Sequence, residues 1–162
     1  MFEPTTKSAI EYARQDKLDV WVEKFLCGEG NNKSLLGALK RDKIEYENPK
    51  LMDLTLLRRL VGFEPEMEIK LTEEQFEGFL IDAYKIAERF SNENWDMPPL
   101  MAFDFSNVNW NIPPLMAYDE SASELHVIFD GNHRFEALKK LGIKEYWVIL
   151  LKSPQKDPRQ RT

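Results

Sequence analysis

Apolar residues in the first half of the chain recur at the spacing of a helix. The clearest stripe lies at i, i+3, i+4, i+7 and i+8 and consists of Leu18, Trp21, Val22, Phe25 and Leu26. Gly28 follows this stripe and suits a helix C-terminal cap. We therefore expect residues 1–92 to form a mainly helical N-terminal part.

Three further patterns belong to this helical part. Leucines at helical spacing predict a short helix at Leu35, Leu36 and Leu39. The stretch from Leu54 to Val61 predicts another, with Asp53 as its N-cap. The clearest helix start is Thr72 with Gln75 three residues later, a capping box. It opens an apolar stripe of Phe76, Phe79, Leu80, Ala83, Ala87 and Phe90.

A tandem repeat follows, WDMPPLMAFD at Trp95–Asp104 and WNIPPLMAYD at Trp110–Asp119, with identity at seven of ten positions. Two adjacent prolines impose an extended backbone and withhold two N–H donors. Each copy is therefore expected to continue as a short edge strand, and the pair to form a hairpin built by duplication. Alternatively, Trp95 and Trp110 line a ligand cleft or a partner surface, since aromatics beside rigid prolines make good contact platforms.

The last third of the chain predicts a strand, a turn, a helix and a second strand. Hydrophobicity alternates over Glu124–Phe129, and Asp130-Gly131 is a turn signal with Asn132 as the expected N-cap. Phe135, Leu138 and Leu141 give an apolar helical face that ends at Gly142, and Tyr146–Leu151 reads as a buried strand. The fold class expected is α/β (α+β), one domain over 1–162 with a small mixed sheet in 93–151 and a helical N-terminal cap.

Phosphate is the ligand that this turn favours. The backbone N–H groups of Asn132, His133 and Arg134 open a helix, where the macrodipole attracts anions. An arginine in a first turn is electrostatically unfavourable unless an anion arrives, and its fork binds phosphate through two donors. Each residue also has a structural explanation: Asp130 as turn former, His133 as a hydrogen-bonding residue, Glu136 as an acid facing the dipole.

Composition narrows the function classes. The chain has 162 residues, 43% apolar and 12% aromatic, enough to fill one core. No apolar run suits a membrane span and no signal peptide is visible, so a cytoplasmic protein is expected. A single cysteine and two histidines argue against a structural metal. The net charge of −6 argues against extensive DNA binding, although residues 152–162 form a basic tail.

The run FDGNHRFEALKKL, from Phe129 to Leu141, resembles the phosphate-handling motif of the ParB/sulfiredoxin superfamily. The resemblance covers roughly residues 95–151 and implies that fold. It also implies that Gly131, His133 and Arg134 contact phosphate, while Asp130 matches an acid of kinase-like members. The implied cofactor is a nucleotide (ATP, ADP or CTP) with magnesium.

Two departures limit what the resemblance implies. Asn132 stands where sulfiredoxins have their reactive cysteine, so a sulfinic acid reductase is excluded. The DNA-reading module of the partition proteins follows their nucleotide domain, and eleven residues follow Leu151 here, so a partition function is not expected.

The segment GEGNNKS, Gly28–Ser34, is similar to a P-loop but has Asn32 where a glycine is required before the lysine. It is either a plain connection between helices or a second wall of the phosphate site, contributed by Asn31, Asn32 and Lys33.

Three functions remain open. The leading hypothesis is a small nucleotide-dependent phosphotransferase or hydrolase, with Gly131 to Arg134 cradling phosphate and Asp130 as base or metal-facing acid. Glu136 is the next candidate for the catalytic acid. The alternatives are a nucleotide-sensing or partner-binding module without turnover, and a DNA-associated or nuclease-like protein.

Overall fold

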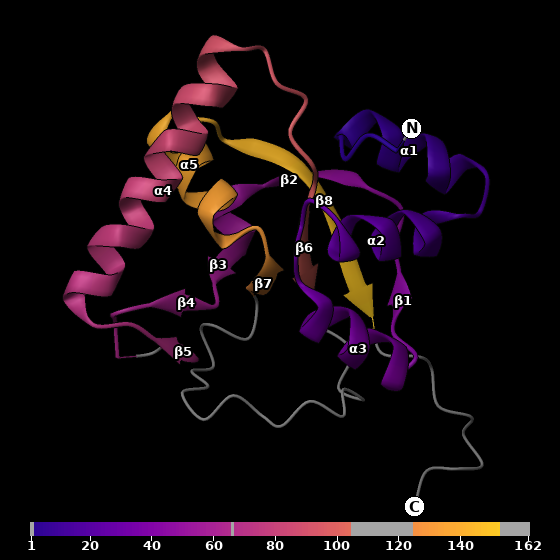
Figure 1. Ribbon diagram of the computed structural model, residues 1–162, viewed down its shortest axis with the longest axis horizontal. Coiled ribbons are helices and arrows are strands. Elements are labelled where there is room, and N and C mark those ends of the chain that lie inside the picture. Colours follow the sequence, from indigo (N-terminus) through magenta and orange to yellow (C-terminus); the bar gives the residue numbers. More distant parts are fainter. Residues whose placement is uncertain (1, 66, 105–124, 153–162) are drawn as a thin grey trace, which may run out of the picture.

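A six-stranded mixed sheet forms the centre of the computed structural model, which describes residues 2–65, 67–104 and 125–152 (Figure 1). The strand order is β1-β8-β6-β7-β3, and β2 also pairs with β8. These strands are β1 (Glu45–Tyr46), β2 (Lys50–Asp53), β3 (Leu57–Arg59), β6 (Leu100–Phe103), β7 (His126–Asp130) and β8 (Glu145–Lys152). A separate two-stranded parallel sheet contains β4 (Val61–Gly62) and β5 (Ile69–Lys70).

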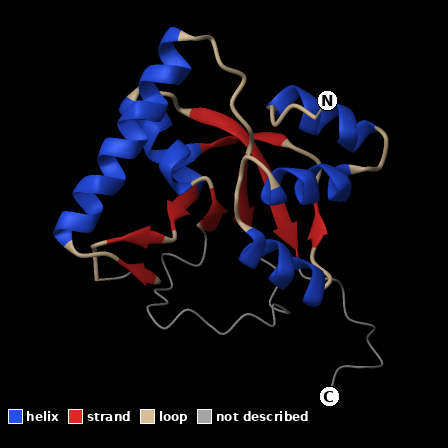
Figure 2. Cartoon of the chain, viewed as in Figure 1, coloured by secondary structure: helices blue, strands red, loops and turns tan. Residues whose placement is uncertain are grey.

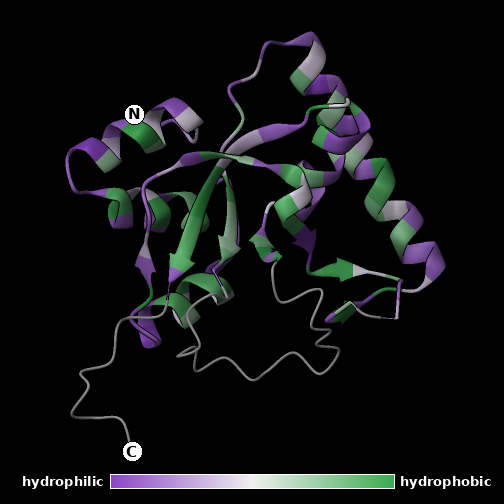
Figure 3. Cartoon of the chain, turned by 180° about the vertical axis from the view of Figure 1, so that it is seen from behind, coloured by the Kyte–Doolittle hydropathy of each residue, from purple (hydrophilic) through white to green (hydrophobic). Residues whose placement is uncertain are grey.

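Helices cover both faces of the central sheet (Figure 2). One face carries α1 (Thr6–Arg14), α2 (Leu18–Cys27) and α3 (Lys33–Arg41), and the other carries α4 (Glu73–Asn92) and α5 (Asn132–Lys140). Side chains of a strand alternate between faces, so Met101 and Phe103 of β6 pack with α1–α3 while Leu100 and Ala102 pack with α5. Figure 3 shows the resulting concentration of hydrophobic residues on the central strands. The α/β fold with a small mixed sheet and a helical N-terminal cap is confirmed.

Local sequence signals place most of the helices correctly. The stripe from Leu18 to Leu26 lies in α2, and the N–H of Gly28 donates to the Lys24 carbonyl at 3.0 Å to close that helix. At the start of α4 the Thr72 hydroxyl accepts from the Gln75 N–H at 3.1 Å. The Thr72 N–H donates back to the Gln75 side chain at 2.9 Å, so the predicted capping box is confirmed.

The predicted helix over Leu54–Val61 is wrong. Asp53 does cap a turn, by accepting from the Thr55 N–H at 2.9 Å, but only a 3-10 turn at Leu54–Leu56 follows. The chain then enters β3, which pairs in parallel with β7. That long-range pairing outweighs the local helical spacing. Residues 45–70 thus contain five short strands, which the mainly helical prediction for 1–92 missed.

The first copy of the repeat forms a central strand instead of the predicted edge strand. β6 lies between β8 and β7, and all four of its residues are buried. Pro98 and Pro99 precede the strand, so Leu100–Phe103 keep every N–H for pairing on both sides. The second copy lies outside the described residues, as does the predicted hairpin.

Within residues 2–65, 67–104 and 125–152, no helix has both the length and the apolar character that a membrane crossing requires.

Leu138→Ala is expected to lower the free energy of unfolding by about 2–5 kcal/mol, because the side chain is fully buried between α5 and the sheet. Urea unfolding would measure the loss. Leu51→Ala is the matched control, since Leu51 is 50% exposed, and its effect should stay within about 0.5 kcal/mol. Equal losses in the two variants would contradict the assigned core.

Candidate functional site

Gly131 makes the sharp turn between β7 and α5. Its φ is 107°, a left-handed conformation that residues with a Cβ rarely adopt. A Cβ built on Gly131 would lie 2.8 Å from a Leu100 methyl carbon and 2.9 Å from Nη2 of Arg134. Glycine is therefore required by both conformation and space, and Gly131 is the residue that precedes the helix as its N-cap.

Asn132 is the first helical residue, so its predicted role as N-cap is wrong. Its buried side chain bridges two other segments. Oδ1 accepts from the Leu60 N–H at 2.8 Å, and Nδ2 donates to the Ile128 carbonyl at 3.2 Å. Asn132 thereby holds the start of α5 against β7 and against the junction between β3 and β4.

Arg134 is a buried structural cation. Nη1 donates to the carbonyls of Pro98 and Pro99, both at 2.7 Å, and Nη2 donates to Oδ2 of Asp130 at 2.7 Å. Burial lowers the pKa of the Arg134 guanidinium, and the Asp130 carboxylate opposes that shift. The first-turn cation is thus compensated inside the protein by Asp130, and its placement there does not require an incoming anion.

The loop between α2 and α3 lies beside this turn, as one of the two interpretations of Gly28–Ser34 predicts. Asn32 caps α3 by accepting from the Leu35 N–H at 3.2 Å, and its Nδ2 reaches Oδ1 of Asp130 at 3.4 Å. Both carboxylate oxygens of Asp130 therefore have donors. Asn31, by contrast, is exposed and is not among the residues that line the adjoining cavity.

A cavity of about 330 Å³ lies where the start of α5, the α2–α3 loop and α4 meet. All five residues of the motif from Asp130 to Arg134 line it, together with Glu29 and Gly30 from the loop. Arg89 from α4 and Trp95 also line it, and the Arg89 guanidinium stacks 3.8 Å from the Trp95 ring centre. The apolar residues Phe25, Ile86 and Pro98 complete the wall. Trp95 thus lines a cleft, the alternative that the sequence left open for it.

Arg89 was missed by sequence reasoning. Its side chain is 51% exposed and pairs with Glu93 at 3.3 Å, so it reads in sequence as an ordinary cation on the polar face of a helix. The available signal was its position six residues before Trp95, near the end of the predicted helix.

His133 is half-buried against the aromatic ring of Phe79, at 4.2 Å between ring centres. Burial lowers the pKa of His133, Asp82 raises it and Arg134 lowers it further. The imidazole is therefore held in its neutral form at neutral pH.

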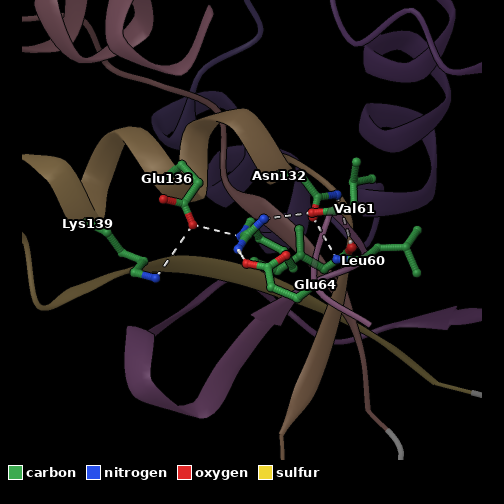
Figure 4. A network of polar contacts seen from close by, with 8 residues as sticks. Leu60, Val61, Glu64, Asn132, Glu136 and Lys139 are labelled. Atoms are coloured by element: carbon green, nitrogen blue, oxygen red, sulfur yellow. Dashed lines mark hydrogen bonds and ion pairs between the residues drawn. The ribbon is translucent and has the colours of Figure 1, made fainter. Parts of the chain in front are cut away.

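Glu136 does not line the cavity. Its Oε1 pairs with Nε of Arg59 at 2.8 Å and with Lys139 at 3.5 Å (Figure 4). The structure consequently brings Asn32, Asp130, Gly131, Asn132, His133 and Arg134 together but places Glu136 elsewhere. Within the described residues, no group of three or more His, Cys, Asp or Glu side chains is arranged to hold a metal.

The fold and site define a mixed α/β protein in which a glycine turn and a helix start border a cavity lined by both polar and apolar residues. No protein-family model matches the chain, and no curated protein matches it either. A solved structure of a Pnob8-like ParB-N domain matches at 18% identity and a TM-score of 0.35. The match covers 72% of this chain and 32% of that chain. The neighbour thus has the family name that the sequence resemblance gave, and at this TM-score no functional argument rests on it.

Arg134→Met is expected to destabilise the fold by about 3–5 kcal/mol, because it leaves buried Asp130 without its cation. Chemical denaturation would give the value. Arg14→Met is the control, since the Arg14–Glu11 pair is exposed and should contribute less than about 1 kcal/mol. A loss below 1 kcal/mol for Arg134→Met would show that the buried pair is not needed.

Acid should destabilise the protein in part through His133. The lowered pKa means that the folded state binds fewer protons than the unfolded state below pH 6.5, the unshifted value. Unfolding free energy therefore falls as pH drops below 6.5, by at most about 1.4 kcal/mol per pH unit from this residue. Urea unfolding at pH 7.5 and 5.5 should show a smaller loss for His133→Gln than for the parent chain, and identical losses would contradict the shift.

Proposed function

We propose that the cavity at the start of α5 binds a phosphate-bearing ligand and that the ligand is a nucleotide. The observation that carries the proposal is that residues 131–134 line a cavity at the beginning of a nine-residue helix. The first N–H groups of a helix have no acceptor within it and carry the positive end of its dipole. A phosphate group supplies both the acceptors and the negative charge.

The other cavity residues suit the rest of a nucleotide. Arg89 contributes a cation that is half exposed and can turn toward a phosphate, and Trp95 contributes an aromatic surface. Glu29 adds an acid to the wall, so binding with magnesium is expected to exceed binding without it. The Asp130–Arg134 pair adds no net charge.

Binding is favoured over turnover by the contacts of the two acids proposed as catalysts. Asp130 has donors on both oxygens, from Arg134 at 2.7 Å and Asn32 at 3.4 Å, so both oxygens are already engaged by side chains of the protein. Glu136 is paired with Arg59 outside the cavity. We therefore prefer a nucleotide-sensing or partner-binding module as the function of this site. Detection of nucleotide turnover would instead establish a phosphotransferase or hydrolase.

Titration with ATP, ADP, CTP and inorganic phosphate, each with and without magnesium, tests the proposal by calorimetry and by amide chemical shifts. The largest shifts are expected at Asn132, His133 and Arg134. Arg89→Gln should weaken affinity about tenfold, equivalent to ~1.4 kcal/mol, because it removes a charged donor. Arg14→Gln, an exposed arginine on α1, is the control. Absence of binding by all four probes, or equal affinity in both variants, would overturn the proposal.

A further inference from the structure

Arg59 joins two parts of the molecule that are separate in the sequence. It ends β3, just before the β4–β5 unit, defined here as residues 60–70 without residue 66. Its side chain is 10% exposed, and it donates to the Val61 carbonyl at 2.9 Å and to Glu64 at 2.6 Å, both in that unit. Its Nε pairs with Glu136 of α5 at 2.8 Å. In Figure 4, dashed lines run from the side chains of Glu64 and Glu136 to this contact.

A second link reaches the first residue of α5. The Leu60 N–H, at the start of the β4–β5 unit, donates to Oδ1 of Asn132 at 2.8 Å. Asn132 and Glu136 are four residues apart and therefore lie on one side of the helix, one turn from each other. Arg59 and Leu60 thus hold the first turn of α5 at both of its ends.

A third link is a row of aromatic rings. Phe63 of the β4–β5 unit lies 5.0 Å from Phe76, Phe76 lies 5.6 Å from Phe79, and Phe79 lies 4.2 Å from His133. The Arg59 guanidinium covers Phe76 at 4.9 Å. The row ends on a residue that lines the cavity.

Side chains are packed closely around Gly62, where these links meet. A Cβ built on Gly62 would collide with the side chains of Glu64 and Arg59, and it would lie 2.7 Å from Nη1 of Arg59. Packed side chains of this kind move together, so a displacement of the first turn of α5 must be taken up by Arg59 and its partners.

We propose that Arg59 is a positioning residue for the cavity and that the β4–β5 unit is coupled to ligand binding there. This inference rests on the proposed phosphate site. A phosphate that binds the N–H groups of residues 132–134 restrains the first turn, and Asn132, Glu136 and His133 transmit that restraint to the unit. Coupling between sites is reciprocal, so loss of the contacts that join the unit to α5 must weaken ligand binding.

Arg58 provides a matched control for Arg59. It is the preceding residue of β3, its side chain is 14% exposed, and it forms a two-bond pair with Glu68 at 2.8 and 3.3 Å. That pair connects β3 to the β4–β5 unit without including α5. Loss of either arginine removes a mostly buried ion pair, but only Arg59 touches the helix that borders the cavity.

The test uses the full chain and whichever of ATP, ADP, CTP or inorganic phosphate binds it most tightly. Hydrogen exchange is expected to slow in residues 60–70 when that probe is added. Arg59→Met should weaken affinity about fivefold or more, while Arg58→Met should change it by less than about twofold, although both lower stability. If Arg59→Met fails to fold, Glu136→Gln removes the charge of its α5 partner and should weaken binding in the same direction.

The outcomes separate the two proposals. If no probe binds the parent chain, the phosphate site and the coupling are both refuted. Two outcomes would refute the coupling alone and leave the phosphate site standing. In the first, a probe binds with its amide chemical-shift changes at residues 132–134, but hydrogen exchange in residues 60–70 is unchanged. In the second, the Arg58 and Arg59 variants lose equal affinity.

Discussion

The buried ion pair between Arg134 and Asp130 is the interaction on which the arrangement around the cavity depends. A buried guanidinium loses its hydration, and that cost is recovered only when its donors find acceptors of good geometry. Here the acceptors come from the end of β7 and from the carbonyls of Pro98 and Pro99. Prolines supply carbonyls without N–H groups of their own, so this turn before β6 adds acceptors without adding donors that would need burial.

The same pair fixes the position of the helical cap. Asp130 uses its second oxygen to hold Asn32, and Asn32 in turn starts α3. The α2–α3 loop and the start of α5 are thereby tied to one carboxylate.

Local patterns predicted the elements whose signals are contained within a few residues. The stripe of α2, the capping box of α4, the glycine turn and β8 could all be read from the sequence. The strands of residues 45–70 could not, because they are two to four residues long and exist through pairing with β7, β8 or each other. Leu54, Leu57 and Leu60 have the spacing of a helix face, yet all three are buried in a turn and short strands.

The sequence predicted the position of the candidate site more accurately than the role of each residue in it. The motif and the α2–α3 loop do meet, as one interpretation of the sequence required. Arg134 was expected to bind an anion because Asp130 was expected to be a turn former or a catalytic acid, and the sequence does not show that Asp130 is the ion-pair partner of Arg134. Asn132 was expected to cap the helix, but its amide satisfies the Leu60 N–H and the Ile128 carbonyl. Leu60 is 72 residues away from Asn132, and such a long-range partner leaves no trace in a single sequence.

The way in which β8 is covered has a consequence for how the protein behaves in a crowded solution. The strand contains the run Tyr-Trp-Val-Ile-Leu-Leu, and an open edge along it would invite pairing with other chains. Two short strands, β1 and β2, share that edge, and the Glu47 N–H bonds the Leu150 carbonyl at 2.9 Å between them. The covering strands contain charged residues, Glu45 in β1 and Lys50 in β2, and Pro49 lies between the two strands. The apolar run of β8 is thus covered by two strands that are too short and too charged to pair with a strand of another chain.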